Sequence, residues 1–117
     1  MYAYGAYGES SDVAFSSHNL PLLDRGVIYA IAHVRGGEEM GRDWYEKGRL
    51  MHKMNTFNDF IDCAKHLINE KYTVPNRLGI MGDSAGGLVM GAVLNMAPEL
   101  FKVKAVILVV DNQFRLR

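Results

Sequence analysis

Apolar side chains follow two kinds of pattern along the chain, and these predict strands and helices in turn. A nearly continuous run of β-branched and small apolar residues covers positions 27–34 and ends at Gly36-Gly37. A second run, over 103–110, has the same character. Runs of this kind are typical of strands that are covered on both faces of a parallel sheet. We therefore expect buried strands at 27–34 and 103–110.

Between these runs, apolar residues recur at intervals of three and four, which predicts an amphipathic helix over about 56–70. The repeating positions are Phe57, Phe60, Ile61, Ala64, Leu67 and Ile68. Thr56, followed by Asp59 three residues later, has the spacing of a helix-capping box. Carboxylates near the start and basic residues near the end of this segment also match the helix dipole.

The rest of the chain continues the alternation. A short strand is expected at about 77–81, and an apolar segment over 88–96 predicts a helix that stops before Pro98. The order strand, helix, strand, helix, strand indicates an α/β fold with a mostly parallel sheet flanked by helices. No internal repeat is present, and the polar residues 9–12 are typical of a loop. The chain is therefore predicted to be one domain or part of one.

A sharp turn between the predicted strand at 77–81 and the following helix carries the candidate chemistry. Its sequence, Gly82-Asp83-Ser84-Ala85-Gly86-Gly87, has the G-x-S-x-G spacing of a nucleophile elbow. The elbow lifts the serine hydroxyl above the carboxyl end of the sheet, and side chains two residues either side of it would collide. At the start of the helix, the amide of Ala85 could donate to a developing oxyanion. The alternative is a glycine-rich turn that only packs helix on strand.

A nucleotide site at this turn is disfavoured. The segment has neither the G-x-G-x-x-G spacing of a dinucleotide fingerprint nor the Lys-Ser/Thr ending of a P-loop.

Composition narrows the function classes further. The 117 residues are 49% hydrophobic and 22% charged, which is typical of a globular domain and excludes collagen, coiled coil and a disordered tail. Thirteen basic residues balance thirteen acidic ones, so we expect no nucleic-acid partner. Apolar runs are far shorter than the roughly 20 residues that cross a bilayer, and no secretory signal is visible. We expect no membrane association and a cytoplasmic location.

Other residues give weaker indications of a metal, substrate or cofactor site. Cys63 and His66 are helix neighbours, but two ligands do not make a zinc site, and a packed thiol beside a surface imidazole is the favoured interpretation. Glu38 and Glu39 could attract a basic substrate, although a solvated pair of loop charges is favoured. The methionines fit as core or interface filler. No metal and no cofactor are predicted.

Several short motifs occur in one order from about residue 2 to residue 110. They are Tyr2-Ala3-Tyr4-Gly5-Ala6-Tyr7-Gly8, Leu22-Leu23-Asp24-Arg25-Gly26, His33-Val34-Arg35-Gly36-Gly37, Glu39-Met40-Gly41-Arg42, Trp44-Tyr45-Glu46, Asn55-Thr56-Phe57-Asn58-Asp59-Phe60 and the turn at 82–87. Together they resemble the prolyl oligopeptidase family of serine peptidases, most closely its oligopeptidase B branch. Several motifs in the correct order are far more specific than the elbow alone.

The resemblance implies an α/β-hydrolase domain that carries a β-propeller in cis and hydrolyses peptide bonds through an acyl-serine. Ser84 then matches the nucleophile, and the amide of Ala85 and the hydroxyl of Tyr4 match the two oxyanion donors. A phenol suits this role because it is rigid and holds its hydroxyl in a fixed position. Tyr7 matches a position near the substrate side chains. Without the resemblance, aromatic packing along a strand would be the preferred interpretation of these tyrosines.

The sequence also departs from the family. In this fold the acid and the histidine of the triad follow the serine, yet all four histidines precede Ser84. Asp111 is an alternative acid, but the family's aspartate lies on a later strand, which favours a structural role. The β-propeller and the C-terminal part of the domain have no counterpart in residues 1–117. We therefore expect a partial catalytic domain that is inactive alone.

The leading hypothesis is a segment of a serine endopeptidase or oligopeptidase that cleaves peptides, after basic residues in the intact parent. One alternative is a carboxylesterase of the hormone-sensitive-lipase type, whose elbow is similar. That group builds its oxyanion hole with an upstream His-Gly-Gly motif, whereas this sequence has the tyrosine-rich segment at 2–8. The other alternative is an inactive remnant that binds peptide or a partner chain.

Overall fold

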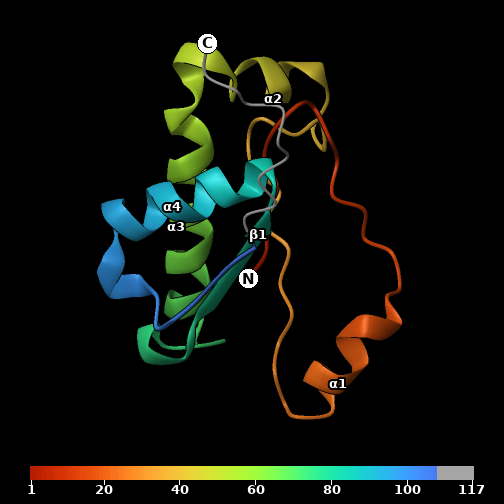
Figure 1. The fold of residues 1–117 in the computed structure, drawn as a ribbon, viewed down its shortest axis with the longest axis vertical. Helices are drawn as coiled ribbons and strands as arrows, with labels where there is room; N and C mark the ends of the chain where they lie inside the picture. Colours follow the sequence, from red (N-terminus) through yellow and green to blue (C-terminus); the bar gives the residue numbers. More distant parts are fainter. Residues whose placement is uncertain (108–117) are drawn as a thin grey trace.

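The fold comes from a computed structural model, which describes the backbone of residues 1–107 and the side chains of residues 1–102. The end of the expected strand at 108–110 and the alternative acid Asp111 lie outside the described residues. Within them the helices are α1 (Leu20–Leu23), α2 (Arg42–Glu46), α3 (Met54–Asn69) and α4 (Ala85–Met96). The strands are β1 (Gly79–Asp83) and β2 (Val103–Ile107). In Figure 1, α4 crosses in front of α3, and α1 lies apart on an outlying loop.

The strand pairing is parallel. β1 pairs with β2 in register from Gly79 opposite Val103 to Asp83 opposite Ile107. On the other side of β1, Tyr2 forms parallel bridges with both Met81 and Ile31. Residues 1–3 therefore lie between β1 and residues 30–32, so all the pairings described here agree with an α/β arrangement. A larger, mostly parallel sheet stays a prediction.

The continuous strand predicted over 27–34 is wrong. The only bridge in this range is at Ile31, and Val27 and Ile28 are 46% and 59% exposed. At the start of the run, the N–H of Val27 donates to Leu22 O (3.0 Å), which places this residue in the turn after α1. Strand pairing occurs further on, where the N–H of Tyr2 donates to Ala30 O (2.8 Å) and its carbonyl accepts from the N–H of Ala32 (2.8 Å). The run is therefore part turn and part strand, with the pairing at residues 30–32.

The strand expected at about 77–81 is present but lies two residues later. Residues Pro75–Arg77 form a 3₁₀ turn, η3, and β1 starts only at Gly79. Proline fixes φ near the helical value and has no N–H for a sheet ladder, so the chain turns before it enters the strand. The shift brings the end of β1 directly against the serine turn.

The long helix is confirmed within two residues at each end, since α3 runs from Met54 to Asn69. Of the expected positions on its apolar face, Phe57, Phe60, Ile61 and Ala64 are buried, whereas Leu67 and Ile68 near its end are half-buried. The buried core joins this face to α4 and β1 and comprises Ala3, Ala32, Val34, Phe57, Phe60, Ile61, Ala64, Leu78, Ile80, Val89, Met90, Val93, Ala97 and Phe101. Burial of these side chains holds α3 against α4 and α4 against the strands.

The predicted capping box is wrong. α3 begins at Met54 without a side-chain cap, and Thr56 and Asp59 make contacts to another segment instead. The hydroxyl of Thr56 donates to Arg35 O (2.5 Å). The carboxylate of Asp59 accepts from the N–H of Arg35 (2.9 Å) and from two nitrogens of its guanidinium (2.8 and 2.6 Å). The two polar residues thus fix the loop at Arg35 onto α3.

Replacing Asp59 with alanine is expected to lower the free energy of unfolding by about 2 kcal/mol, because it removes a bidentate ion pair and leaves the guanidinium without its partner. The two side chains are 29% and 17% exposed, so solvent screens the pair only in part. Chemical denaturation measures the loss. Asp62→Ala, at an exposed position of the same helix, is the control and should change stability by less than about 0.5 kcal/mol. Equal losses for both variants would contradict the fixing role.

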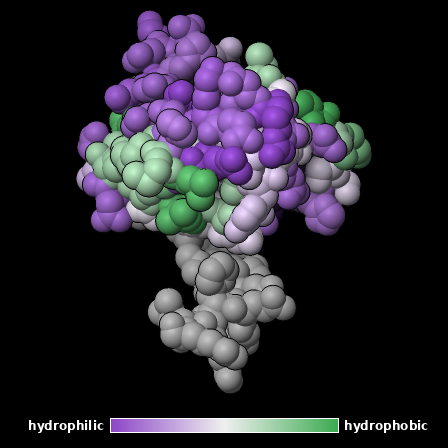
Figure 2. All heavy atoms as spheres, turned by 90° about the horizontal axis from the view of Figure 1, so that it is seen from above, coloured by the Kyte–Doolittle hydropathy of each residue, from purple (hydrophilic) through white to green (hydrophobic). Residues whose placement is uncertain are grey.

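The end of the molecule at α2 carries exposed charge pairs. Figure 2 looks onto this end and shows a mostly hydrophilic surface. Arg42 contacts Glu38 (2.7 Å) and Glu46 (3.3 Å), and Arg49 contacts Glu46 (2.7 Å). Such surface pairs add little stability. Glu38 is therefore paired, and Glu39 accepts from the N–H of Ser11 (3.1 Å), so these residues do not form an open acidic patch.

In the part of the chain that the structure describes, no helix combines the length and the apolar character that crossing a bilayer requires.

Candidate active site

Ser84 occupies the turn between the last residue of β1, Asp83, and the first residue of α4, Ala85. Its backbone has φ 49° and ψ −119°, a conformation that L-residues rarely adopt. Its side chain is exposed. A non-glycine residue held in this way is typical of functional sites, where the surrounding fold imposes the strain. The predicted strand-turn-helix arrangement is therefore present, with Ser84 at its apex.

Two glycines make this turn possible for the reason expected from the sequence. A Cβ atom at Gly82 would lie 2.6 Å from the carbonyl oxygen of Gly86. A Cβ atom at Gly86 would lie 2.6 Å from the carbonyl oxygen of Ala3. Both contacts are with backbone, which cannot move aside as a flexible side chain can. The turn therefore packs directly on itself and on the segment that precedes Tyr4.

Tyr4 lies beside the serine. It directly follows residues 1–3, which pair with β1, so it reaches the same edge of the sheet as Ser84. Burial raises the pKa of Tyr4, the charge of Glu9 raises it further, and a side-chain hydrogen bond with Ser84 opposes these effects. The net direction is upward, so the phenol keeps its proton at neutral pH and can donate a hydrogen bond.

Ala85 and Tyr7 share a cavity of about 250 Å³ next to the serine turn. The N–H of Ala85 belongs to the first turn of α4, where backbone donors have no acceptor within the helix. Tyr7 has φ 57° and is 75% exposed, so its ring is open to solvent at the rim of the molecule. Leu88, one turn into α4, completes the apolar side of this cavity. The four residues singled out in the sequence thus gather around the start of α4.

Sequence reasoning missed two polar contacts next to this site. The hydroxyl of Tyr2 donates to Asp83 Oδ1 (2.9 Å) and ties the end of β1 to the N-terminal segment. Burial and the neighbouring carboxylate raise the pKa of Tyr2. The ammonium of Lys53 donates to Gly5 O (2.5 Å) and lines the cavity of Ala85 and Tyr7. Periodicity could not reveal either contact, because each joins residues far apart in sequence.

The histidines and the cysteine lie elsewhere. His33 and His66 line a different cavity together with Cys63, and burial raises the pKa of that thiol. His52 lies in η2 (Leu50–His52), before α3, and no histidine lines the cavity of Ala85 within the described residues. Among the described residues, no three His, Cys, Asp or Glu side chains lie close enough together to hold a metal ion. Around Ser84 the described residues thus place a tyrosine hydroxyl and the first backbone amide of α4, without a histidine in the adjoining cavity.

Comparison with known proteins places this arrangement in a family. The sequence model of the Prolyl oligopeptidase family matches residues 13–112. The chain is 61% identical over 103 residues to dipeptidyl aminopeptidase BI from Pseudoxanthomonas mexicana, and 56% identical over 103 residues to protease 2 from Moraxella lacunata. Each alignment covers 88% of this chain but only 14% and 15% of the relative.

The solved structures agree. Oligopeptidase B from Leishmania major matches with a TM-score of 0.85 and 59% identity, over 88% of this chain and 14% of that one. Oligopeptidase B from Trypanosoma brucei, solved with covalently bound antipain, gives the same score and identity over 88% of this chain and 15% of that one. The chain therefore spans about a seventh of these relatives. On sequence and structure together, the chain belongs to the prolyl oligopeptidase family.

Proposed function

We propose that this chain is the nucleophile-bearing segment of a serine peptidase that hydrolyses peptide bonds through an acyl-serine. The observation that carries the proposal is the strained, exposed Ser84 at the apex between β1 and α4, with the backbone of Tyr4 packed against Gly86 at the start of that helix. Ser84 is the nucleophile, and the Ala85 amide and the Tyr4 hydroxyl stabilise the oxyanion. Tyr7, at the cavity rim, contacts the substrate side chains.

The reaction needs a base that takes the proton of Ser84. The serine oxygen bonds to the carbonyl carbon of the substrate, and the base passes that proton to the amine that leaves as the C–N bond breaks. Water then hydrolyses the ester. All histidines of this chain precede Ser84, so we infer that the intact protein supplies the base and its orienting acid from further residues.

The intact protein is proposed to cleave after basic residues, as its likeness to oligopeptidase B suggests. Most of the residues that recognise the basic side chain are proposed to lie outside residues 1–117. A β-propeller in the same chain would also lie outside them. Cleavage preference is tested on the intact protein with peptides that differ only in the residue before the cleaved bond. Faster cleavage after arginine or lysine than after proline supports the proposal, and the reverse order contradicts it.

The role of this segment is tested in a chimera, defined as Leishmania major oligopeptidase B with the matched segment replaced by the residues of this chain. Identity of 59% and a TM-score of 0.85 predict that the replacement folds in place. We expect the chimera to hydrolyse peptide substrates and to lose this activity on Ser84→Ala. A folded chimera without serine-dependent hydrolysis would argue against the proposed function.

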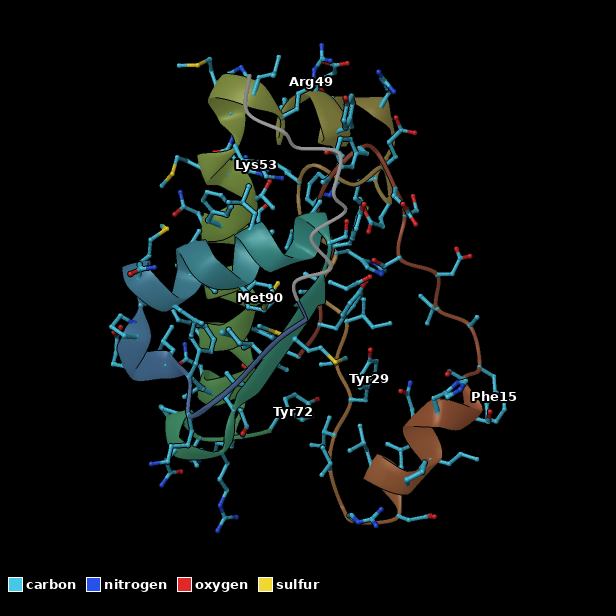
Figure 3. All side chains as sticks on the ribbon, in the orientation of Figure 1. Phe15, Tyr29, Arg49, Lys53, Tyr72 and Met90 are labelled. Atoms are coloured by element: carbon cyan, nitrogen blue, oxygen red, sulfur yellow. The ribbon has the colours of Figure 1, made fainter. Side chains whose placement is uncertain are left out.

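Replacing Tyr4 with phenylalanine in the chimera is expected to lower kcat by about 10²- to 10³-fold, because one oxyanion donor is lost. KM should change little, since the oxyanion forms only in the transition state. Steady-state kinetics separate the two parameters. Tyr72→Phe is the matched control, because it removes a hydroxyl from an exposed ring just beyond the C-terminal end of α3 (Figure 3). A loss confined to KM would assign Tyr4 to substrate binding instead.

A further inference from the structure

The segment that carries Tyr4 is held by an unusual turn. Gly5 is buried with φ +66°, and a Cβ atom there would lie 2.7 Å from methyl groups of both Thr56 and Val34. On its other side, a Cβ atom at Gly36 would collide with the carbonyl oxygen of Gly5. The turn after Tyr4 is therefore pressed against α3 and the loop at Gly36. The direction in which Tyr4 leaves the sheet depends on this packing.

Lys53 is the polar residue that forms a hydrogen bond to this turn. Its ammonium is partly buried at the start of α3 and donates to the carbonyl oxygen of Gly5 at 2.5 Å. No carboxylate lies within ion-pair distance of it among the described residues, whereas the neighbouring Arg49 is paired with Glu46. Figure 3 shows Lys53 and Arg49 at the same end of the molecule. Burial lowers the pKa of Lys53, which reflects the cost of placing a charge there.

Lys53 directly precedes α3, and its hydrogen bond differs from those of the polar residues in the first turns of that helix. Lys53 is the N-cap residue with helical φ and ψ, and Thr56 and Asp59 follow it at intervals of three, so the three side chains leave the start of the helix on one side. Thr56 and Asp59 both bind Arg35 and fix that loop. Lys53 alone of the three bonds to the segment at Gly5. It also lines the cavity that contains Ala85 and Tyr7.

We propose that Lys53 is a positioning residue for the oxyanion donor: by holding the carbonyl of Gly5, it sets the place of the Tyr4 hydroxyl relative to Ser84 and Ala85. The proposal rests on the proposed peptidase function. A carbonyl held by a charged donor forms a stronger hydrogen bond than one held by a neutral group, and this bond acts one residue from Tyr4. An error of about 1 Å at an oxyanion donor costs up to about a hundredfold in rate.

The test is a double-mutant cycle in the chimera with Lys53→Met and Tyr4→Phe. Lys53→Met alone is expected to lower kcat by about ten- to a hundredfold with KM nearly unchanged. In the Tyr4→Phe background the same change is expected to cost less than about twofold, because the hydroxyl to be positioned is already absent. Lys53→Arg keeps a charged donor and should retain most activity. Lys65→Met, at an exposed position of α3, is the control.

Equal fold losses in the two backgrounds would show a merely structural role and overturn the proposal, as would no loss at all. A second measurement does not depend on activity: ¹³C NMR of tyrosine labelled at Cζ gives the pKa of Tyr4. Release of the turn should expose the ring, so the pKa of Tyr4 in Lys53→Met is expected to fall toward its ordinary value of 10. An unchanged pKa also overturns the proposal.

The two proposals fail in different ways. A folded wild-type chimera without hydrolysis contradicts the proposed function, while the response of the Tyr4 pKa to Lys53→Met still decides the positioning role. If Lys53→Met does not fold, Lys53→Gln serves in both measurements, because it removes the charge and shortens the donor while keeping a polar side chain.

Discussion

The isolated 117-residue chain is expected to react with a fluorophosphonate probe at least about 10⁴-fold more slowly than the chimera. The expected reason is that residues 1–117 do not supply the base of Ser84, as proposed above. A serine hydroxyl is a weak nucleophile at neutral pH and becomes reactive only when a base lies within about 2.6–3.2 Å of it. The chain's four histidines all precede Ser84, and none lines the cavity of Ala85 within the described residues. Labelling of the two proteins under equal conditions measures the difference.

Ser84→Ala in each protein is the control for labelling at other residues. We expect it to remove the signal of the chimera and to leave the weak signal of the isolated chain unchanged. Serine-dependent labelling of the isolated chain at the rate of the chimera would contradict the expectation. It would mean that His18, His33, His52 or His66 serves as the base.

The elements that were predicted well from sequence are those whose pattern is local. The apolar period of α3 and the glycine spacing around Ser84 each lie within a short stretch of chain, and both are where they were expected. The glycine spacing predicted the turn because its cause is steric, and the backbone contacts of Gly82 and Gly86 now show that cause.

The predictions that were wrong concern residues whose partners are distant in sequence. Thr56 and Asp59 have the spacing of a helix cap, but both bind Arg35, more than twenty residues away. Tertiary hydrogen bonds replaced the local ones that the motif suggests. Similarly, the apolar run at 27–34 has strong strand propensity, yet the N–H of Val27 bonds to Leu22 in the turn after α1, and only residues 30–32 pair with residues 1–3. Propensity does not report which distant segment a residue pairs with.

The candidate site shows the same division. Ser84 and Ala85 follow from the turn motif, whereas Tyr4 and Tyr7 were identified only through resemblance to a family. From the residues alone, a tyrosine in an alternating segment indicates packing. The structure adds the reason that Tyr4 reaches the serine: residues 1–3 pair with β1, which ends at the same edge. Lys53 had no sequence signal, since its partner is a backbone carbonyl.

Replacing Gly86 with alanine is expected to lower the free energy of unfolding by about 3 kcal/mol. Alanine is the better helix former, so a change inside α4 would ordinarily stabilise the chain. At Gly86 the added methyl would lie 2.6 Å from the carbonyl oxygen of Ala3, which is backbone held between two strand partners. The helix start or the segment before Tyr4 must then move, and the oxyanion site opens with it.

The matched control lies in the same helix. At Gly91 an added Cβ atom meets nothing within 4 Å, so Gly91→Ala is expected to raise the free energy of unfolding by about 0.5–1 kcal/mol through helix propensity alone. Thermal unfolding of the two chimera variants, followed alongside peptide hydrolysis, measures both effects. We expect opposite signs in stability, with activity lost only for Gly86→Ala. If Gly86→Ala were as stable and as active as Gly91→Ala, the close packing of the serine turn on Ala3 would not be what holds the nucleophile beside Tyr4.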